Sequence, residues 1–249
     1  MPATPTWPPH SLPRLFVDQA LSGGLSLTLD GGPANYLGNV LRLKAGAGVK
    51  LFDDKTGEWL ARIEAVDRKR VTLTIADHLR EREVGPDLWL LFAPLKRTTT
   101  DWLVEKATEL GAARLMPVMT QRTVADRVNL DRLRSITIEA AEQCDRAALP
   151  EICEPVKLAN LLKSWPTDRA LLFADETGGA PLSEAAKPGS AAILIGPEGG
   201  FTDEERAAIH AVGTAVALGP RILRAETAAL AALSLWMAAA GDWSRPPRT

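Results

Sequence analysis

The sequence predicts an α/β protein in two parts, a small β-rich part followed by an α/β domain built on a parallel sheet. In the N-terminal third, short apolar runs are separated by Gly, Asp and Asn, which favour turns. Further on, apolar runs alternate with longer segments of helical periodicity. A charged stretch with Gly85 and Pro86, residues 80–87, separates the two patterns. We therefore expect domains at 1–83 and 84–249.

The N-terminal domain is expected to fold as a small β-barrel. Its strand-like runs are residues 14–17, 25–29, 49–52, 59–63 and 71–75. The polar segment 53–58 between two of them is typical of a hairpin loop. Several short strands within about 80 residues favour a small barrel.

The second domain is expected to alternate strands with helices. Strands are predicted at 88–92, 115–119, 170–174, 191–195 and 215–218, and helices at 99–110, 130–144 and 226–240. Gly111 ends the first of these helices, and the capping-box pair Thr202 and Glu205 predicts another helix start. This alternation indicates parallel pairing. General rules of chain topology by themselves favour an unknotted, doubly wound sheet.

Two loops, residues 194–202 and 218–228, are the most informative feature. Each follows a buried apolar run and leads into a helix, and their glycines let a ligand approach bare backbone. Two such loops at the carboxyl ends of parallel strands predict a ligand crevice. The Gly196 to Gly200 spacing fits neither the P-loop nor the dinucleotide fingerprint, which argues against those two kinds of site.

Five segments, taken in order, resemble the RsmE family of the SPOUT class of methyltransferases. They are residues 40–46, 105–111, 139–146, 195–202 and 218–228. The family uses S-adenosylmethionine to methylate N3 of a uridine in the 16S rRNA of the small ribosomal subunit. The resemblance implies a C-terminal SPOUT-like, trefoil-knotted parallel-sheet domain and a PUA-like or OB-like RNA-binding barrel before it. It also implies a homodimer that completes the methyl-donor pocket.

The same resemblance implies which residues line the S-adenosylmethionine pocket. Carried over by motif, they are Glu176, Gly196, Glu198, Gly199, Gly200, Leu218, Gly219, Ile222, Leu223, Arg224 and Thr227. Backbone amides and carbonyls in these loops can bind the adenine edges, and apolar side chains such as Ile222 and Leu223 can cover its faces.

The implied chemistry also selects candidate catalytic residues. N3 of uridine carries a proton and is a poor nucleophile, so methylation requires a base or a cation that stabilises the imide anion. Arg224 and Arg146 are the candidates for the cation. Glu226 is a candidate base, although at a helix N-terminus it could equally serve the helix dipole. Glu198 is interpreted as an acceptor that orders its loop.

Any RNA-binding surface must be a local patch, because the net charge of −2 is not the basic balance of many nucleic-acid-binding proteins. The candidate RNA-binding residues are Arg42, Arg68, Lys69, Arg70, Lys96, Arg97 and Arg122. Such clusters are also typical of an ordinary solvated face. The chain departs from the family at Asn35 and Tyr36, where histidine is frequent, and at Ala225, where threonine is common.

Composition is compatible with a cytoplasmic enzyme. No apolar run is long enough for a membrane span, and residues 1–9 lack the features of a secretion signal and are expected to be a disordered leader. Two cysteines and three scattered histidines give no disulfide framework and no metal-ligand spacing. Two alternatives remain open, a SPOUT enzyme acting on tRNA and a non-catalytic RNA-binding or assembly factor.

Overall fold

The computed structural model describes residues 12–125 and 127–245, so the expected leader over residues 1–9 lies outside it. The chain forms two compact units. The barrel unit comprises Met1–Val84 with Ala141–Ala148, and the sheet unit comprises Gly85–Ala140 with Leu149–Thr249. Within the described ranges, no helix is long and apolar enough to cross a bilayer.

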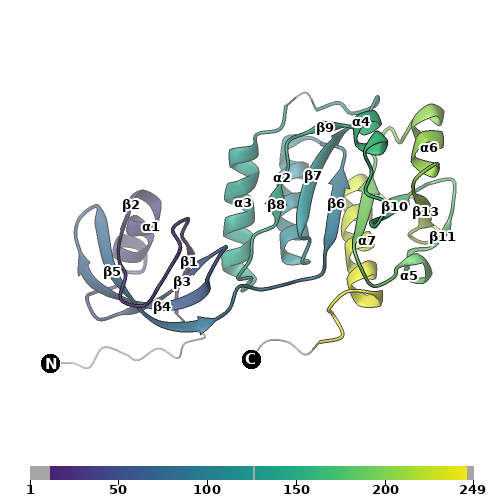
Figure 1. Ribbon diagram of the computed structural model, residues 1–249. Coiled ribbons are helices and arrows are strands. Elements are labelled where there is room, and N and C mark those ends of the chain that lie inside the picture. Colours follow the sequence, from purple (N-terminus) through teal and green to yellow (C-terminus); the bar gives the residue numbers. More distant parts are fainter. Residues whose placement is uncertain (1–11, 126, 246–249) are drawn as a thin grey trace. The chain divides into compact units, whose positions relative to one another are not determined.

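The barrel unit contains the five predicted strands. They are β1 (Arg14–Phe16), β2 (Ser26–Asp30), β3 (Gly48–Asp53), β4 (Gly57–Val66) and β5 (Arg70–Arg80), in the order β1-β3-β4-β5-β2. Among the described strands of this unit, only β1 pairs in parallel, with β3, and the pairing of β3 with β4 confirms the predicted hairpin. Alternate residues of β5, Val71, Leu73 and Ile75, are buried on one face. The sheet is therefore a mixed half-barrel around its own core (Figure 1).

A short helical segment after β2 was not expected from the sequence. Helix α1 (Gly31–Asn35) leads directly into a π-helical turn, η2 (Tyr36–Val40). The start of α1 contains two glycines and Pro33, which are unfavourable inside a helix, so helix propensity does not predict this segment. Burial of Leu37 in the barrel core stabilises it instead.

A buried carboxylate, Glu58 on β4, organises one end of the barrel unit. Its side chain is 3% exposed and accepts hydrogen bonds from Arg14 Nε at 2.5 Å and Arg80 Nη2 at 2.9 Å. Arg14 also donates to the carbonyl oxygens of Ala141 and Arg146, while Arg80 donates to that of Asp145. These carbonyls lie in and just after the last turn of helix α3 (Leu130–Gln143), where guanidinium groups complement the helix C-terminus.

The ion pairs of Glu58 with Arg14 and Arg80 should stabilise the folded protein to an extent that depends on pH. Burial acts to raise the pKa of Glu58, but the hydrogen bonds and charges of Arg14 and Arg80 lower it below its ordinary value. Because the folded-state pKa is depressed, the stabilisation is present above the unfolded-state pKa and is lost as pH falls through the folded value. We expect Glu58→Gln to destabilise the protein by about 3 kcal/mol at neutral pH, with a smaller difference from wild type in acid.

Urea unfolding of both proteins at neutral and acidic pH measures this. The exposed Glu81→Gln serves as the matched control and should change little. Equal stability of Glu58→Gln and wild type at neutral pH would contradict the prediction.

The sheet unit is built on one parallel sheet. Its strands are β6 (Leu88–Phe92), β7 (Arg114–Met119), β8 (Glu151–Ile152), β9 (Val156–Lys157), β10 (Ala170–Ala174), β11 (Ala180–Pro181), β12 (Ala191–Ile195) and β13 (Thr214–Ala217). The order is β11-β13-β10-β12-β6-β7-β8, with β9 also on β7, and every pairing is parallel. The expected α/β class is therefore confirmed. Among the described strands of this unit, only the two-residue strands β8, β9 and β11 were not predicted from the sequence.

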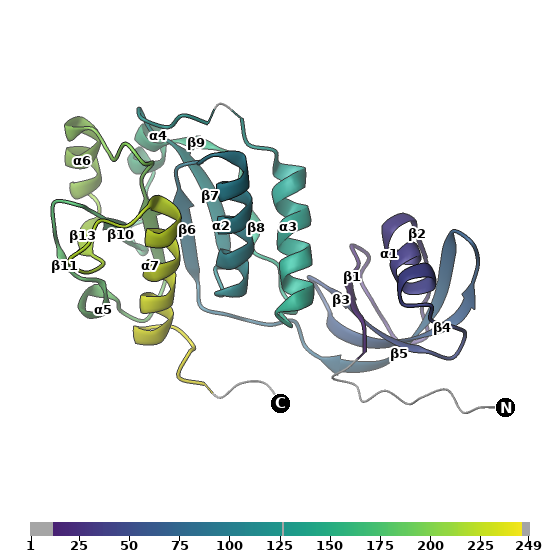
Figure 2. The ribbon, with the colours of Figure 1, turned by 180° about the vertical axis from the view of Figure 1, so that it is seen from behind.

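Helices cover both faces of this sheet (Figures 1 and 2). The further helices are α2 (Arg97–Glu109), α4 (Leu158–Lys163), α5 (Leu182–Ala185), α6 (Asp203–His210) and α7 (Ala225–Ala239). Ile193 and its alternate neighbours face a core with α2, α5 and α7, whereas Ala192 and Leu194 face a second core with α4 and α6. This two-sided burial explains why β12 is apolar throughout.

The chain crosses its own path at one edge of the sheet. From β12 it passes over β10 to reach β13, and it then returns to place α7 against β12, β6 and α2. Figure 2 shows α7 beside α2 on this face. The unit therefore follows the SPOUT-like course implied by the resemblance, not the simpler path that general topology favours.

Candidate functional site

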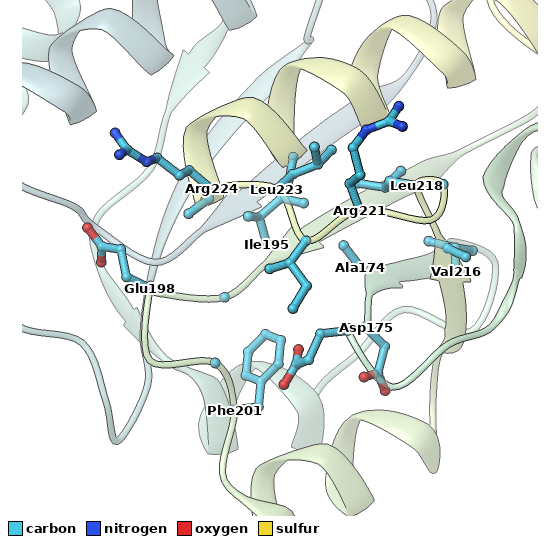
Figure 3. Close-up of a pocket in the computed structure, with 18 of the residues that line it drawn as sticks. Ala174, Asp175, Ile195, Glu198, Phe201, Val216, Leu218, Arg221, Leu223 and Arg224 are labelled. Carbon is cyan, nitrogen blue, oxygen red and sulfur yellow. The ribbon is translucent and has the colours of Figure 1, made fainter.

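Three loops meet at the carboxyl edge of the parallel sheet. Strands β12, β10 and β13 are neighbours in that order, so the segments that follow them lie side by side. Residues of all three segments line a cavity of about 520 Å³ (Figure 3). This volume lies in the range of small-molecule sites, and the location matches the crevice predicted from the sequence.

The loop after β12 presents closely packed backbone to the cavity. A Cβ on Gly196 would come within 3.0 Å of the Phe201 ring, and Gly200 has a positive φ of 67°. The predicted capping box is present, because Thr202 accepts from the Glu205 amide and Glu205 accepts from the Thr202 amide. The other oxygen of the Glu205 carboxylate accepts from the backbone amide of Gln121 at 2.7 Å, which links this loop to the segment that follows β7.

An ion-pair cluster builds the wall that follows β10. Arg206 on α6 donates to both Asp175 and Glu176, with 2.6 Å between its Nη2 and the Glu176 Oε1. Asp175 also accepts from the amide and hydroxyl of Thr177. Its Oδ2 is buried, accepts no hydrogen bond within the described chain, and lies 3.7 Å from Nε2 of His210. The Asp175 carboxylate is therefore a buried anchor of this wall, whereas the Glu176 carboxylate, with a side chain 45% exposed, can meet a ligand.

The loop after β13 supplies the apolar and basic part of the lining. Gly219 has a positive φ of 107°, which a side chain would strain. Ile222 is 89% exposed, an unusual state for isoleucine that indicates a surface to be covered. Arg224 is the N-cap residue of α7, and Figure 3 shows its side chain and that of Glu198 extending from the same side of the cavity.

The structure gathers most of the residues expected at the S-adenosylmethionine pocket. Those in the cavity lining are Glu176, Gly196, Glu198, Gly199, Gly200, Leu218, Gly219, Ile222, Leu223 and Arg224. Thr227 and Glu226 are outside the lining, and Glu226 lies in the first turn of α7, where its charge suits the helix dipole. Arg146 belongs to the barrel unit, is 9% exposed and is not among the lining residues.

A second cavity, of about 860 Å³, lies beside the first and shares Glu198 and Gly199 with it. We call it the basic groove. Its charged lining residues are Lys96, Arg97, Arg122, Arg127, Arg132, Asp101 and Glu198. Arg122 is fixed at the boundary because its Nη1 donates to the Gly199 carbonyl at 2.7 Å. Three of the expected RNA-binding residues therefore line one concave surface.

The other expected RNA-binding residues lie on the barrel unit and are exposed. Arg68, Lys69 and Arg70 lie at the tight turn between β4 and β5. Arg42 follows η2 and has a φ of 53°, which is uncommon for a residue with a side chain. Sequence reasoning missed Arg206, Asp101 and Arg132, since their roles depend on partners distant in sequence.

Models of two RNA-modifying families match the chain. One, described as an RNA methyltransferase domain, matches residues 82–237, and one described as an RNA methyltransferase PUA domain matches residues 29–76. A relative from Synechocystis sp., named ribosomal RNA small subunit methyltransferase E, is 33% identical, covering 84% of this chain and 72% of its own. A relative of the same name from Rickettsia conorii is 29% identical, covering 89% and 93%.

Solved structures agree in fold over nearly the whole chain. A Legionella pneumophila protein described as a methyltransferase, solved with S-adenosylmethionine, is 32% identical with a TM-score of 0.84 and covers 93% of this chain and 99% of its own. Ribosomal RNA small subunit methyltransferase E from Neisseria gonorrhoeae, also bound to S-adenosylmethionine, is 29% identical with a TM-score of 0.86 and the same coverage. The chain thus belongs to the RsmE family of S-adenosylmethionine-dependent RNA methyltransferases.

Proposed function

We propose that this protein methylates N3 of a specific uridine in the 16S rRNA of the small ribosomal subunit, with S-adenosylmethionine as methyl donor. The observation that carries the proposal is the meeting of both signature loops at one cavity, which opens beside the basic groove across Glu198 and Gly199. A donor pocket and a cationic surface are thereby adjacent, as methyl transfer to RNA requires. The relatives named for small-subunit ribosomal RNA support the choice of RNA. We place the reaction in the cytoplasm.

The residues of the first cavity fit S-adenosylmethionine. Bare backbone at Gly196 and Gly219 suits the edges of adenine, and Leu218, Ile222 and Leu223 can cover its faces. The partly exposed carboxylate of Glu176 is an acceptor for ribose hydroxyls or an amino group. When bound, S-adenosylmethionine supplies an electrophilic methyl group on sulfur.

We assign to Arg224 the stabilisation of the negative charge that develops on the uracil ring. Arg224 lines the donor cavity, is exposed, and has no ion-pair partner among the described residues. A guanidinium beside the uracil carbonyl oxygens stabilises the imide anion formed as N3 loses its proton. Lys96, Arg97 and Arg122 grip RNA phosphates in this proposal, and Arg42 and residues 68–70 extend the RNA contact on the barrel unit.

Incubation with labelled S-adenosylmethionine and small subunits that lack the modification tests the proposal. We expect 3-methyluridine in the 16S rRNA on nucleoside analysis, and no label in bulk tRNA. Arg224→Ala should lower turnover by at least about 100-fold, with unchanged thermal stability. Labelling of tRNA alone would favour the alternative SPOUT activity, and a protein that binds no S-adenosylmethionine would be a non-catalytic factor.

The Arg206 cluster should set the affinity for the methyl donor. Arg206 orients Glu176, whose Oε1 lies 3.1 Å from the position of a Cβ on Gly200. Removal of the Arg206 side chain therefore leaves Glu176 free to change its position in the pocket wall. Because charge-assisted hydrogen bonds contribute about 1.5–3 kcal/mol each, we expect Arg206→Ala to raise the Kd for S-adenosylmethionine by about 10-fold or more. Calorimetric titration measures this, with the exposed Lys163→Ala on α4 as control. An unchanged Kd would remove the cluster from donor binding.

We also propose a homodimer formed through α7. Residues 227–241 contain no charged side chain, although Leu235 on this helix is 38% exposed and Trp243 beyond it is 48% exposed. An exposed helix surface without charge is typical of a subunit interface. Ile222, almost fully exposed in the donor cavity, is a further surface that a second copy can cover.

Sedimentation analysis tests the dimer. Wild type should sediment as a dimer at micromolar concentration, whereas Leu235→Glu should shift it to monomer because a charge is then buried at the interface. Lys163→Glu, which is also exposed but lies on α4, should remain dimeric. A monomeric wild-type protein would contradict the proposal.

A further inference from the structure

Glu198 occupies the boundary between the donor cavity and the basic groove. It lines both cavities, and its carboxylate has no hydrogen-bond or ion-pair partner among the described residues. In Figure 3 the backbone of its loop lines the donor cavity, while the side chain extends outward on the side where Arg224 also projects. If Glu198 ordered its loop, its carboxylate would accept hydrogen bonds from the backbone amides of that loop. The free carboxylate therefore calls for another role.

The basic groove has the size and charge of a nucleotide site. Five basic and two acidic side chains line it, and Arg132 donates to both oxygens of Asp101 in a bidentate pair with distances of 2.6–3.0 Å. Lys96, Arg97 and Arg127 have no ion pair within the described chain. Leu95, Leu133 and Val128 give the groove an apolar floor, against which a base can pack.

We infer that the basic groove receives the target uridine, flipped out of its RNA, and that the Glu198 carboxylate accepts the proton from its N3. The inference rests on the proposed function and adds to it the nucleotide site and the proton acceptor. Base flipping is the general solution for enzymes that act on a base atom. Because Glu198 is shared by both cavities, a base held in the groove presents its N3 edge at the entrance of the donor pocket.

Methyl transfer begins with the loss of the proton on N3. The N3–H bond breaks, its electron pair stays on N3, and the proton goes to an oxygen of Glu198. Arg224 stabilises the charge that spreads onto the uracil carbonyl oxygens. The N3 electron pair forms the new bond to the methyl carbon as the carbon–sulfur bond breaks, and the electron pair of that bond stays on sulfur, which leaves as a neutral thioether. Glu198 then releases its proton to solvent from its exposed position.

The other carboxylates near the site are poorer candidates. Asp101 is committed to Arg132, and its side chain is 15% exposed. Glu226 is outside both linings. Asp175 and Glu176 are held by Arg206 on the far wall of the donor cavity. Glu198 alone among these described residues combines a free carboxylate with access to both cavities.

The isosteric variant Glu198→Gln tests the inference, with Glu184→Gln on α5, outside both linings, as matched control. We expect Glu198→Gln to lower kcat for small subunits by about 10²- to 10⁴-fold, while the Kd for S-adenosylmethionine stays within about twofold of wild type. Its residual kcat should increase with pH, because hydroxide replaces the lost base. It should also increase on RNA containing 5-fluorouridine, whose N3 is more acidic.

A binding measurement without the methyl donor tests the groove independently. Uridine 5′-monophosphate, followed by ligand-detected NMR, should bind the cofactor-free wild type and Glu198→Gln. Binding should be lost in Arg97→Ala and Arg127→Ala, which each remove a groove cation that has no ion pair within the described chain. A Glu198→Gln enzyme with normal kcat, or one that loses only donor affinity, would overturn the inference although methylation by wild type would still stand. If wild type itself makes no 3-methyluridine, the proposed function fails instead.

Discussion

The parallel pairing of β10 with both β12 and β13 is the constraint on which the site depends. Parallel strands end on the same edge, so three segments separated by many residues in sequence are brought to one cavity without further interactions. The pairing is stabilised by burial on both faces, since Ile193 and Leu194 each pack into a different core. Loss of this pairing would separate Glu176, Gly196 and Leu218, and the cavity that they line would be lost.

Local interactions then give the cavity its chemistry. The capping box at Thr202 fixes where α6 begins, and Arg206 on that helix reaches back to Asp175 and Glu176. Arg122 fixes the other side through the Gly199 carbonyl. The glycine-rich loop is therefore held from two directions, which orders its backbone on one side and leaves the Glu198 side chain free on the other.

The segment after α3 illustrates how one motif can serve stability. Residues 139–146 belong to the resemblance to the family, and Arg146 is one of the two candidates for the catalytic cation. In the structure, the carbonyls of this segment accept from Arg14 and Arg80, and Asp145 adopts a φ of 63° at the end of the helix. Together with Glu58, these contacts hold the segment to the barrel unit. The catalytic role of Arg146 stays a prediction.

The sequence by itself determined the fold class, the alternation of strands and helices, and ten of the residues in the donor cavity. The fold class and the alternation follow from periodicity, capping residues and turn signals, which are local, whereas the ten cavity residues were implied by the family resemblance. Tertiary structure alone decided that Thr227 and Glu226 lie outside the lining, that Arg206 holds Glu176, and that Glu198 is shared with the basic groove. Those facts depend on which strands are neighbours and where each side chain points, and neither is encoded in any short stretch of sequence.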